Sequence, residues 1–584
     1  MVSQLLKIAL VALCTVATAA PAPAALPLDE RQVLADPYAP TTTTCPRSSL
    51  VRPATGLNPS ESCYVTARKS VANTALASWL KRQGNFSTSS LPTVGFTSSG
   101  GGYRALLETA GVVQAFDGRD SKFNVSGLYQ GLVYEAGLSG GAWFLSSLAG
   151  NNWPTVSYLR DNLWAQAFQN SLLLPANLLS SSGLAEYALV TSDITAKEAA
   201  GYNVTIVDPY GRLLSYQLLQ GYDGGVATRL SGLTSLSNFT SHNVPYPIIT
   251  TTNVNGTQGQ CAPPTNAIIF EFHPYEYGSW DTGVSAFAQT TYMGTNITNG
   301  RPTVAGKCTT HYDNLGYVLG TSSDVFFAAC SVIPPANSTS SADLGNVLEG
   351  LVSKTHEPLF TDLFGIYVNP FYKYQRSSQV QHNPLLTLVD GGAAGQSPST
   401  PSHPPYHHTS SLITNTEPHR PDNPIWPFIQ PARSVDVLII NDNSADTPDN
   451  FPNGTEIQQT YLNAQAAGLH KMPFIPAVST FVSRGLNKRA TFFGCNETGT
   501  TFMVWLPNVA YTYPSGQSTA KLEYTVAETD AMIANGNAIA TQNGTVGWPF
   551  CLACAVKNRD GGKLPAGCHE CFEKYCYYRS GTSG

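Results

Sequence analysis

The sequence predicts an α/β fold, and three observations support that prediction. From about Cys45 onward, short apolar runs alternate with stretches of helical pattern, as in proteins built from alternating strands and helices. Residues 91–116 and 131–150 each contain an apolar run, a glycine-rich turn and then a helical pattern. Residues 383–392 and 432–447 each contain a further apolar run that ends in a polar turn.

The composition is typical of a large folded protein and argues against a nucleic-acid partner. The chain has 584 residues, of which 42% are hydrophobic and 12% charged, so a sizeable core can form. The net charge is −6 at pH 7, and no basic stripe is present that would attract a polyanion.

The N-terminus has the pattern of a secretory signal. Lys7 precedes an apolar run and small residues follow it, so we expect residues 1–20 to be a signal peptide and not a buried helix. Residues 21–44 are rich in Pro, Ala and Thr, and we expect a propeptide or flexible lead there. We expect the folded domain to cover residues 45–584 and the protein to be located outside the cell or in the cell wall.

Sequons and cysteines agree with secretion. Eleven of the twelve cysteines lie beyond the predicted signal, and an oxidising route favours disulfides, with one cysteine left over. Asn-X-Ser/Thr sequons accept N-linked glycans in secreted chains. They occur at Asn85, Asn124, Asn203, Asn238, Asn255, Asn296, Asn337, Asn453, Asn496 and Asn543.

The C-terminal tail carries a cysteine pattern with two interpretations. In residues 551–576, one Cys-x-x-Cys pair is followed by a second, which is the spacing of a zinc ribbon. The signal peptide favours disulfides over zinc, and the pairing cannot be read from the sequence. We therefore expect no metal and no cofactor.

Residues 397–421 do not fit the surrounding pattern. This segment contains six prolines, four histidines and no periodic apolar face. It is either a disordered surface insertion or a translated intron, because joining "GGAAGQ" to "DNPIWPF" gives a continuous chain. A metal-binding role for its histidines is weakly supported, since their spacing follows no ligand pattern.

Ser139 is the candidate nucleophile. It is the central residue of Gly137-Leu138-Ser139-Gly140-Gly141, a Gly-x-Ser-x-Gly pattern between a predicted strand and a predicted helix. A sharp turn there exposes the hydroxyl, and the helix N-terminus favours developing negative charge. The alternative is a tight turn in a glycine-rich chain.

A glycine loop supplies candidates for stabilising an oxyanion. Gly100, Gly101 and Gly102 leave backbone N–H groups uncovered, and the loop lacks the Lys-Ser/Thr ending of a nucleotide-binding P-loop. Arg104 opens the helix that follows, where a fixed cation holds a phosphate or an oxyanion, or forms an ordinary ion pair.

The base that accepts the serine proton has two candidates. A histidine would complete a Ser-His-Asp triad, but His470 and His569 do not stand in a persuasive loop after a strand. Asp390 follows the apolar run Leu385–Val389 and precedes two glycines, so a partly desolvated carboxylate there could accept the proton directly. The alternative for Asp390 is a turn residue.

Three ordered motifs, "SGGGYRA", "GLSGG" and "LVDGG", resemble the catalytic module of fungal secreted lysophospholipases (phospholipase B) and mammalian cytosolic phospholipases A2. The similarity to the fungal enzymes extends over roughly residues 45–576. It includes "FEFHPYEYGSWD", "NDNSADT" and the cysteine tail.

The resemblance implies a three-layer α/β/α hydrolase with a central mixed sheet, and a Ser/Asp dyad without histidine. Ser139 matches the nucleophile, Asp390 the base, Arg104 the arginine near the phosphate or oxyanion, and Gly101 and Gly102 the oxyanion hole. One departure is that Ala393-Ala394 replaces the usual acidic or polar continuation after Asp-Gly-Gly.

The implied activity is acyl-ester hydrolysis of phospholipids and lysophospholipids at a transient membrane or micelle surface. The alternatives are a secreted esterase or lipase with a Ser-His-Asp triad and a catalytically inactive, glycosylated wall protein. The oligomeric state cannot be predicted. If residues 397–421 are present, they begin seven residues after Asp390 and could displace it.

Overall fold

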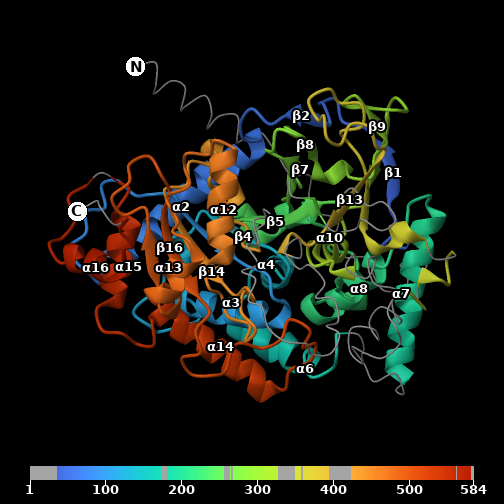
Figure 1. Ribbon diagram of the computed structural model, residues 1–584. Coiled ribbons are helices and arrows are strands. Elements are labelled where there is room, and N and C mark those ends of the chain that lie inside the picture. Colours follow the sequence, from blue (N-terminus) through green and yellow to red (C-terminus); the bar gives the residue numbers. More distant parts are fainter. Residues whose placement is uncertain are drawn as a thin grey trace, which may run out of the picture.

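The structure is a computed structural model with a central β-sheet between layers of helices (Figure 1). It describes residues 36–172, 181–254, 263–264, 267–326, 349–350, 352–356, 359–392, 422–560 and 562–579. The predicted signal peptide, residues 21–35 of the predicted lead and the segment 397–421 lie outside the described residues.

The main sheet is mixed, as the family resemblance implied. Its strand order is β15-β16-β14-β3-β4-β5-β6-β7-β8-β2, and β13 pairs with both β5 and β12. The run from β16 through β14, β3 and β4 to β5 is parallel, and the other pairings are antiparallel. The strands are β2 (Val51–Pro53), β3 (Val94–Ser98), β4 (Tyr134–Gly137), β5 (Tyr246–Asn253), β6 (Ile269–Phe272), β7 (Glu276–Ser279), β8 (Ala286–Gln289), β12 (Gly365–Val368), β13 (Leu385–Val389), β14 (Val437–Asp442), β15 (Thr491–Phe493) and β16 (Phe502–Pro507).

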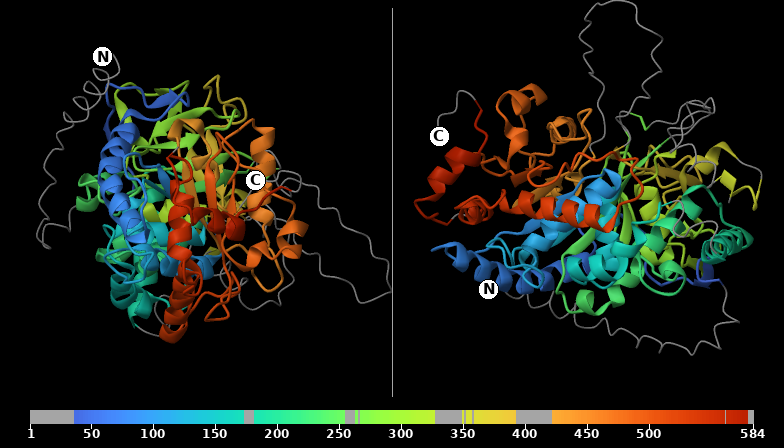
Figure 2. Two further views of the ribbon diagram at one scale, coloured as in Figure 1. Left: turned by 90° about the vertical axis from the view of Figure 1, so that its left-hand side faces the viewer. Right: turned by 90° about the horizontal axis from the view of Figure 1, so that it is seen from below.

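Helices lie on both sides of this sheet, as the two perpendicular views show (Figure 2). Helices α3, α4, α8, α10 and α14 pack on one another, whereas α2 packs on α15 and against β5. The α/β prediction is therefore confirmed. The main helices are α2 (Pro59–Gln83), α3 (Gly102–Phe116), α4 (Gly140–Gly150), α7 (Ser181–Ala199), α8 (Val207–Leu218), α10 (Leu315–Ser322), α12 (Thr455–Ala466), α14 (Val526–Thr541), α15 (Trp548–Lys557) and α16 (Cys568–Tyr575).

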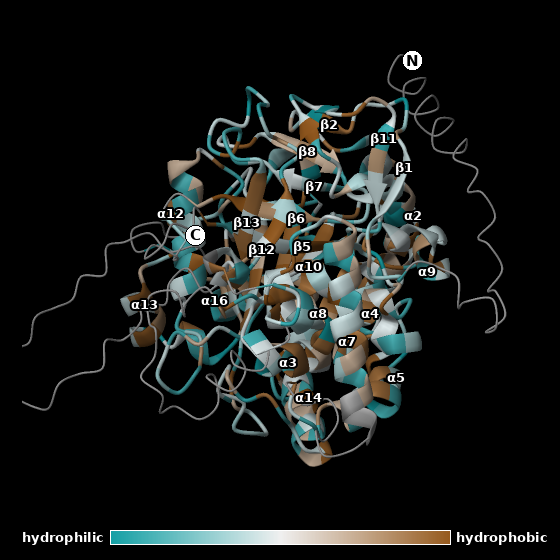
Figure 3. Ribbon diagram, turned by 90° about the vertical axis from the view of Figure 1, so that its right-hand side faces the viewer, coloured by the Kyte–Doolittle hydropathy of each residue, from teal (hydrophilic) through white to brown (hydrophobic). Residues whose placement is uncertain are grey.

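The central strands are apolar because both of their faces are covered. Every residue of β3, β4 and β14 is buried, as expected of parallel strands between helical layers. Brown, hydrophobic ribbon is concentrated in β5, β12 and β13, and teal in the outer loops (Figure 3). In the described part of the chain, no helix combines the length and the apolar character needed to span a membrane.

Helices α3 and α14 approach each other closely through glycine. A Cβ added to Gly111 would lie 2.1 Å from the carbonyl oxygen of Ile533 and 2.7 Å from the Cα of Gly536. Thr525 begins α14 with a capping box, in which its hydroxyl accepts from the Glu528 N–H and Glu528 accepts from the Thr525 N–H. The close packing of α3 on α14 holds α3 in place, and α3 begins at the glycine loop.

The prediction of a flexible lead is wrong for residues 36–44. Thr41–Thr44 form β1, which pairs antiparallel with β11 (Lys307–Thr310). Tyr38 is buried, and its hydroxyl donates to Asp208 at 2.7 Å. The Pro- and Thr-rich composition indicated flexibility, but pairing with a strand more than 260 residues away orders this arm.

Disulfides fasten both ends of the described chain, which confirms the prediction of disulfides. Cys45 pairs with Cys308 beside β1, and Cys495 pairs with Cys576. In the tail, Cys551 pairs with Cys571 and Cys554 with Cys568, so its four cysteines bridge α15 to α16 and do not form a zinc ribbon. Cys63 is also disulfide-bonded, whereas Cys261 and Cys330 lie outside the described residues.

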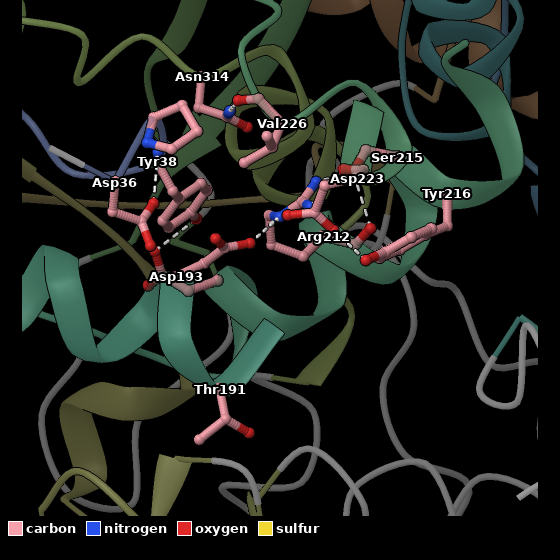
Figure 4. A network of polar contacts seen from close by, with 12 residues as sticks. Asp36, Tyr38, Thr191, Asp193, Arg212, Ser215, Tyr216, Asp223, Val226 and Asn314 are labelled. Carbon is pink, nitrogen blue, oxygen red and sulfur yellow. Dashed lines mark hydrogen bonds and ion pairs between the residues drawn. The ribbon is translucent and has the colours of Figure 1, made fainter. Parts of the chain in front are cut away.

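A buried ionic network holds the N-terminal arm against α7 and α8 (Figure 4). Arg212 on α8 donates to Asp193 on α7 at 2.6 Å and forms an ion pair with Asp223 at 3.2 Å. Lys197 forms an ion pair with Asp208 at 2.5 Å, and Asp208 also accepts from Tyr38 in the arm.

Candidate active site

Ser139 lies on a strained turn between β4 and α4. Its φ is 52° and its ψ −121°, an unfavourable conformation for a residue with a side chain. The turn is tight, since a Cβ on Gly137 would lie 2.5 Å from the carbonyl oxygen of Gly141. The Ser139 N–H donates to the hydroxyl of Ser322 on α10 at 3.1 Å, a contact that no sequence pattern indicated.

Asp390 lies at the end of β13 and its carboxylate accepts a hydrogen bond from the Ser139 hydroxyl. Its Oδ1 also accepts from the Gly392 N–H at 2.9 Å, and its own N–H donates to the carbonyl of Asp324 at 3.1 Å. Burial raises the pKa of Asp390 to about 7, although the two hydrogen bonds to its carboxylate oppose that rise. The side chain is therefore a base whose pKa suits proton transfer near neutral pH.

The glycine loop passes directly beside Ser139. A Cβ on Gly100 would lie 2.9 Å from the Cβ of Ser139. Gly101 and Gly102 have φ values of 126° and 60°, which glycine adopts without penalty and other residues rarely adopt. The loop that leads into α3 and the turn that leads into α4 thus lie side by side.

Arg104 on α3 is buried against this loop. Its Nε donates to the carbonyl of Asn443 at 3.0 Å, and its Nη1 donates to the carbonyl of Gln517. Its Nη2 is buried without a hydrogen-bond partner, and a Cβ on Gly101 would lie 2.5 Å from it. Burial lowers the pKa of Arg104, and nearby acidic residues, Asp422 foremost, oppose that shift. A free donor of this fixed cation therefore points at the glycine loop.

Sequence reasoning missed a group of buried carboxyl groups around this site. Burial raises the pKa of each, and repulsion from neighbouring carboxylates raises those of Asp422, Asp446 and Glu456 further. The polar loop after β14 was recognised, but nothing in the sequence showed that its aspartates meet a glutamate at the start of α12. The residues are Asp422, Asp442, Asp446 and Glu456.

The triad alternative requires a histidine beside Ser139. His470 and His569 are exposed, and the buried His273 shares a hydrogen bond with a tyrosine hydroxyl. Among the described side chains, the hydrogen bond of the Ser139 hydroxyl goes to Asp390.

One buried trio lies away from this site and has the residue types of a metal site. One ligand atom from each of Glu61, His273 and Glu276 lies within 4.8 Å of the others. Arg433 already forms an ion pair with Glu61, and Arg52 with Glu276. Because these two guanidinium groups offset the charge that would attract a cation, we assign the trio to a structural network.

Most of the described sequons present their asparagine to solvent, as glycan attachment requires. Asn238 is half-buried and its side-chain amide donates to the carbonyl of Asn152 at 2.8 Å, while Asn453 is also half-buried. Asn255 and Asn337 lie outside the described residues. The exposed asparagines are Asn85, Asn124, Asn203, Asn296, Asn496 and Asn543.

The chain leaves the site at Gly392 and returns to it at Asp422. A Cβ on Gly392 would lie 2.1 Å from Oδ1 of Asp422, so the two flanks of segment 393–421 touch. Asp390 is hydrogen-bonded to Ser139 in the chain that includes residues 397–421, so the displacement that this segment could have caused is not observed.

Comparison with known proteins places the chain among lipid-hydrolysing relatives. Residues 94–582 match the lysophospholipase catalytic domain family. The chain is 35% identical to lysophospholipase 2 of Aspergillus fumigatus over 93% of both chains. It is 34% identical to lysophospholipase 1 of Saccharomyces cerevisiae over 92% of this chain and 83% of that protein.

The fold also matches a solved structure. Human GIVD cytosolic phospholipase A2 superimposes with a TM-score of 0.62 at 18% identity, covering 89% of this chain and 72% of that one. At this identity the match concerns the fold alone, and it agrees with the mixed sheet and flanking helices described above.

Proposed function

This chain belongs to the lysophospholipase catalytic domain family, and we propose that it hydrolyses fatty-acyl esters of lysophospholipids and glycerophospholipids. The observation that carries the proposal is the Ser139 hydroxyl, which is held on a strained strand-to-helix turn and donates to Asp390 beside the glycine loop. Activated serines in ester hydrolysis require this combination of nucleophile, base and oxyanion donors.

The mechanism that we propose is a Ser/Asp dyad with an acyl-enzyme. Asp390 accepts the Ser139 proton as Oγ bonds to the acyl carbonyl carbon, and the N–H groups of Gly101 and Gly102 stabilise the oxyanion. The ester C–O bond then breaks, and the leaving alkoxide takes the proton from Asp390. Water next attacks the acyl-enzyme and gives a proton to Asp390, which returns it to the Ser139 oxygen as the fatty acid leaves.

Arg104 supplies positive charge to the same reaction. Its unpartnered Nη2 lies against Gly101 in the glycine loop, where it could donate to the oxyanion or to the substrate phosphate. A guanidinium held rigidly by two backbone carbonyls loses little freedom when it binds an anion.

The test is fatty-acid release from lysophosphatidylcholine by the purified protein and by Ser139→Ala. The expected result is activity in the parent and none in the variant, with unchanged thermal unfolding. Activity in Ser139→Ala would contradict the proposal, and a folded but inactive parent would support the inactive wall protein. Recovery of activity on deletion of 397–421 would instead identify that segment as a defect.

We also propose that the protein is a secreted glycoprotein. The signal-like residues 1–20, the exposed sequons and the disulfides support this proposal. Protein collected from the culture medium should lose apparent mass after enzymatic removal of N-glycans. Retention inside the cell, or no change in mass, would contradict it.

A further inference from the structure

Asp422 contacts both the glycine loop that begins at Gly100 and the turn that follows Asp390. Its Oδ1 accepts from the Gly100 N–H at 3.1 Å, and its carbonyl oxygen accepts from the same N–H at 3.2 Å. Its own N–H donates to a carboxylate oxygen of Glu456, which anchors Asp422 to the start of α12.

The fit around the Asp422 carboxyl group leaves no room for adjustment. A Cβ on Gly100 would lie 2.2 Å from Oδ1, and a Cβ on Gly392 would lie 2.1 Å from it. One carboxyl oxygen therefore touches both the glycine loop and the turn that follows Asp390. Because Gly100 also borders Ser139, a shift of Asp422 would move the loop relative to the nucleophile.

Four carboxyl groups and one guanidinium, from the elements packed around Asp422, interact with its side chain. Asp390 at the end of β13, Asp442 at the end of β14 and Asp446 in the loop after it are carboxyl groups, as is Glu456 on α12. The cation among them is Arg104 on α3. Burial, then Asp390, raise the pKa of Asp422 well above its ordinary value, and Arg104 opposes the shift. Repulsion between the two carboxylates therefore opposes having Asp390 and Asp422 ionised together.

We propose that Asp422 is a positioning residue which holds the glycine loop against the Asp390 turn. The inference rests on the proposed function, since it assigns Asp422 a part in the same site. An acid without charge can bridge the two loops without repelling the Asp390 carboxylate or the oxyanion that develops nearby. Ionisation of Asp422 would place a second negative charge there, so activity should fall at alkaline pH.

The experiment compares kcat and KM across pH for the full-length wild type, Asp422→Asn and Asp422→Ala, with lysophosphatidylcholine as substrate. Asparagine keeps an oxygen that accepts from Gly100 but cannot ionise. Its kcat near neutral pH should fall less than that of the alanine variant, and the alkaline decline should move up by about one pH unit or more. Alanine leaves the Gly100 loop without its side-chain anchor, so kcat should fall about 10- to 100-fold with KM little changed.

Two results would overturn the inference. They are an alkaline decline that is unchanged in Asp422→Asn, and a wild-type kcat in a folded Asp422→Ala. Should the alanine variant fail to fold, the pH profile of Asp422→Asn decides alone. Ser139→Ala is measured in parallel, because activity in that variant would contradict the proposed function, whereas its inactivity beside wild-type-like Asp422 variants would contradict only this inference.

Discussion

Two buried regions of this protein hold several ionisable groups, and they balance their charges differently. In the network between the N-terminal arm, α7 and α8, three carboxylates form ion pairs with two buried cations, and Figure 4 shows the part around Arg212. Asp193 and Asp223 pair with Arg212, and Asp208 pairs with Lys197.

At the candidate active site, the carboxyl groups outnumber the cations. Asp390 and four further carboxyl groups lie around a single guanidinium, that of Arg104, which partly offsets the rise in the pKa of Asp422 and Asp442. Burial raises the pKa of both Asp193 and Asp390 to about 7, but Arg212 opposes the rise at Asp193 and no cation opposes it at Asp390. Paired charges hold segments together, whereas an unpaired carboxyl group is free to exchange a proton. We therefore expect the first region to determine stability and the second to determine reactivity.

The largest effect that would test this difference is expected from Asp390→Asn. Asparagine keeps the shape and the oxygen that contacts Gly392 but removes the base, so activity should fall roughly 10²- to 10⁴-fold. Thermal unfolding should change little, because the replaced group has no cationic partner. Measurement of kcat/KM beside the unfolding temperature checks both parts. Activity that survives in a folded variant would point to a different base and revive the histidine alternative.

Arg212→Met should lower the stability of the protein and leave its activity unchanged. Methionine fills much of the same volume but leaves Asp193 and Asp223 buried without a cation, which should cost about 3–5 kcal/mol of unfolding free energy. Denaturant unfolding measures this loss, and Arg301→Met at an exposed position is the matched control, with an expected change within about 0.5 kcal/mol. The kcat of the folded fraction should be unchanged. A large drop in kcat without loss of stability would contradict the separation of roles.

The parts of this molecule that could be predicted from the sequence depend on neighbours along the chain. The strand-turn-helix units around Gly100 and Ser139 were predictable because the apolar run, the glycines and the helical pattern are contiguous. The arm at residues 36–44 was not, since its order comes from pairing with β11 and from the buried contact of Tyr38. The disulfide partners were open for the same reason.

In the candidate site, too, only the features that depend on neighbours along the chain could be predicted from the sequence. Ser139, Asp390 and the glycine loop stand at the ends of recognisable strands, so the sequence indicated each of them. Asp422 and the other carboxyl groups differ from ordinary surface acids only because they are buried together, which depends on how β14, α12 and the segment after residue 421 meet. No local pattern marks an aspartate as buried or protonated.

The pH dependence of kcat/KM tests whether the carboxyl group without a cationic partner is the base. Asp390 accepts a proton only when it is ionised, and its pKa is raised to about 7, so kcat/KM should rise with pH up to about 7. Below that value kcat/KM should fall about tenfold for each pH unit, while circular dichroism shows that the protein stays folded. An acid limb near the ordinary aspartate pKa would show that Asp390 is not the titrating base.

The smallest expected effect belongs to Tyr38→Phe, in the balanced region. The change removes the hydroxyl that donates to Asp208 at 2.7 Å, but Lys197 still pairs with that carboxylate. Asp208 therefore keeps its charge partner, and the unfolding free energy should fall by only about 1 kcal/mol. Tyr222→Phe, at an exposed tyrosine, is the matched control and should show no change. A loss as large as that of Arg212→Met would mean that the tyrosine hydroxyl, and not the ion pairs, holds the arm in place.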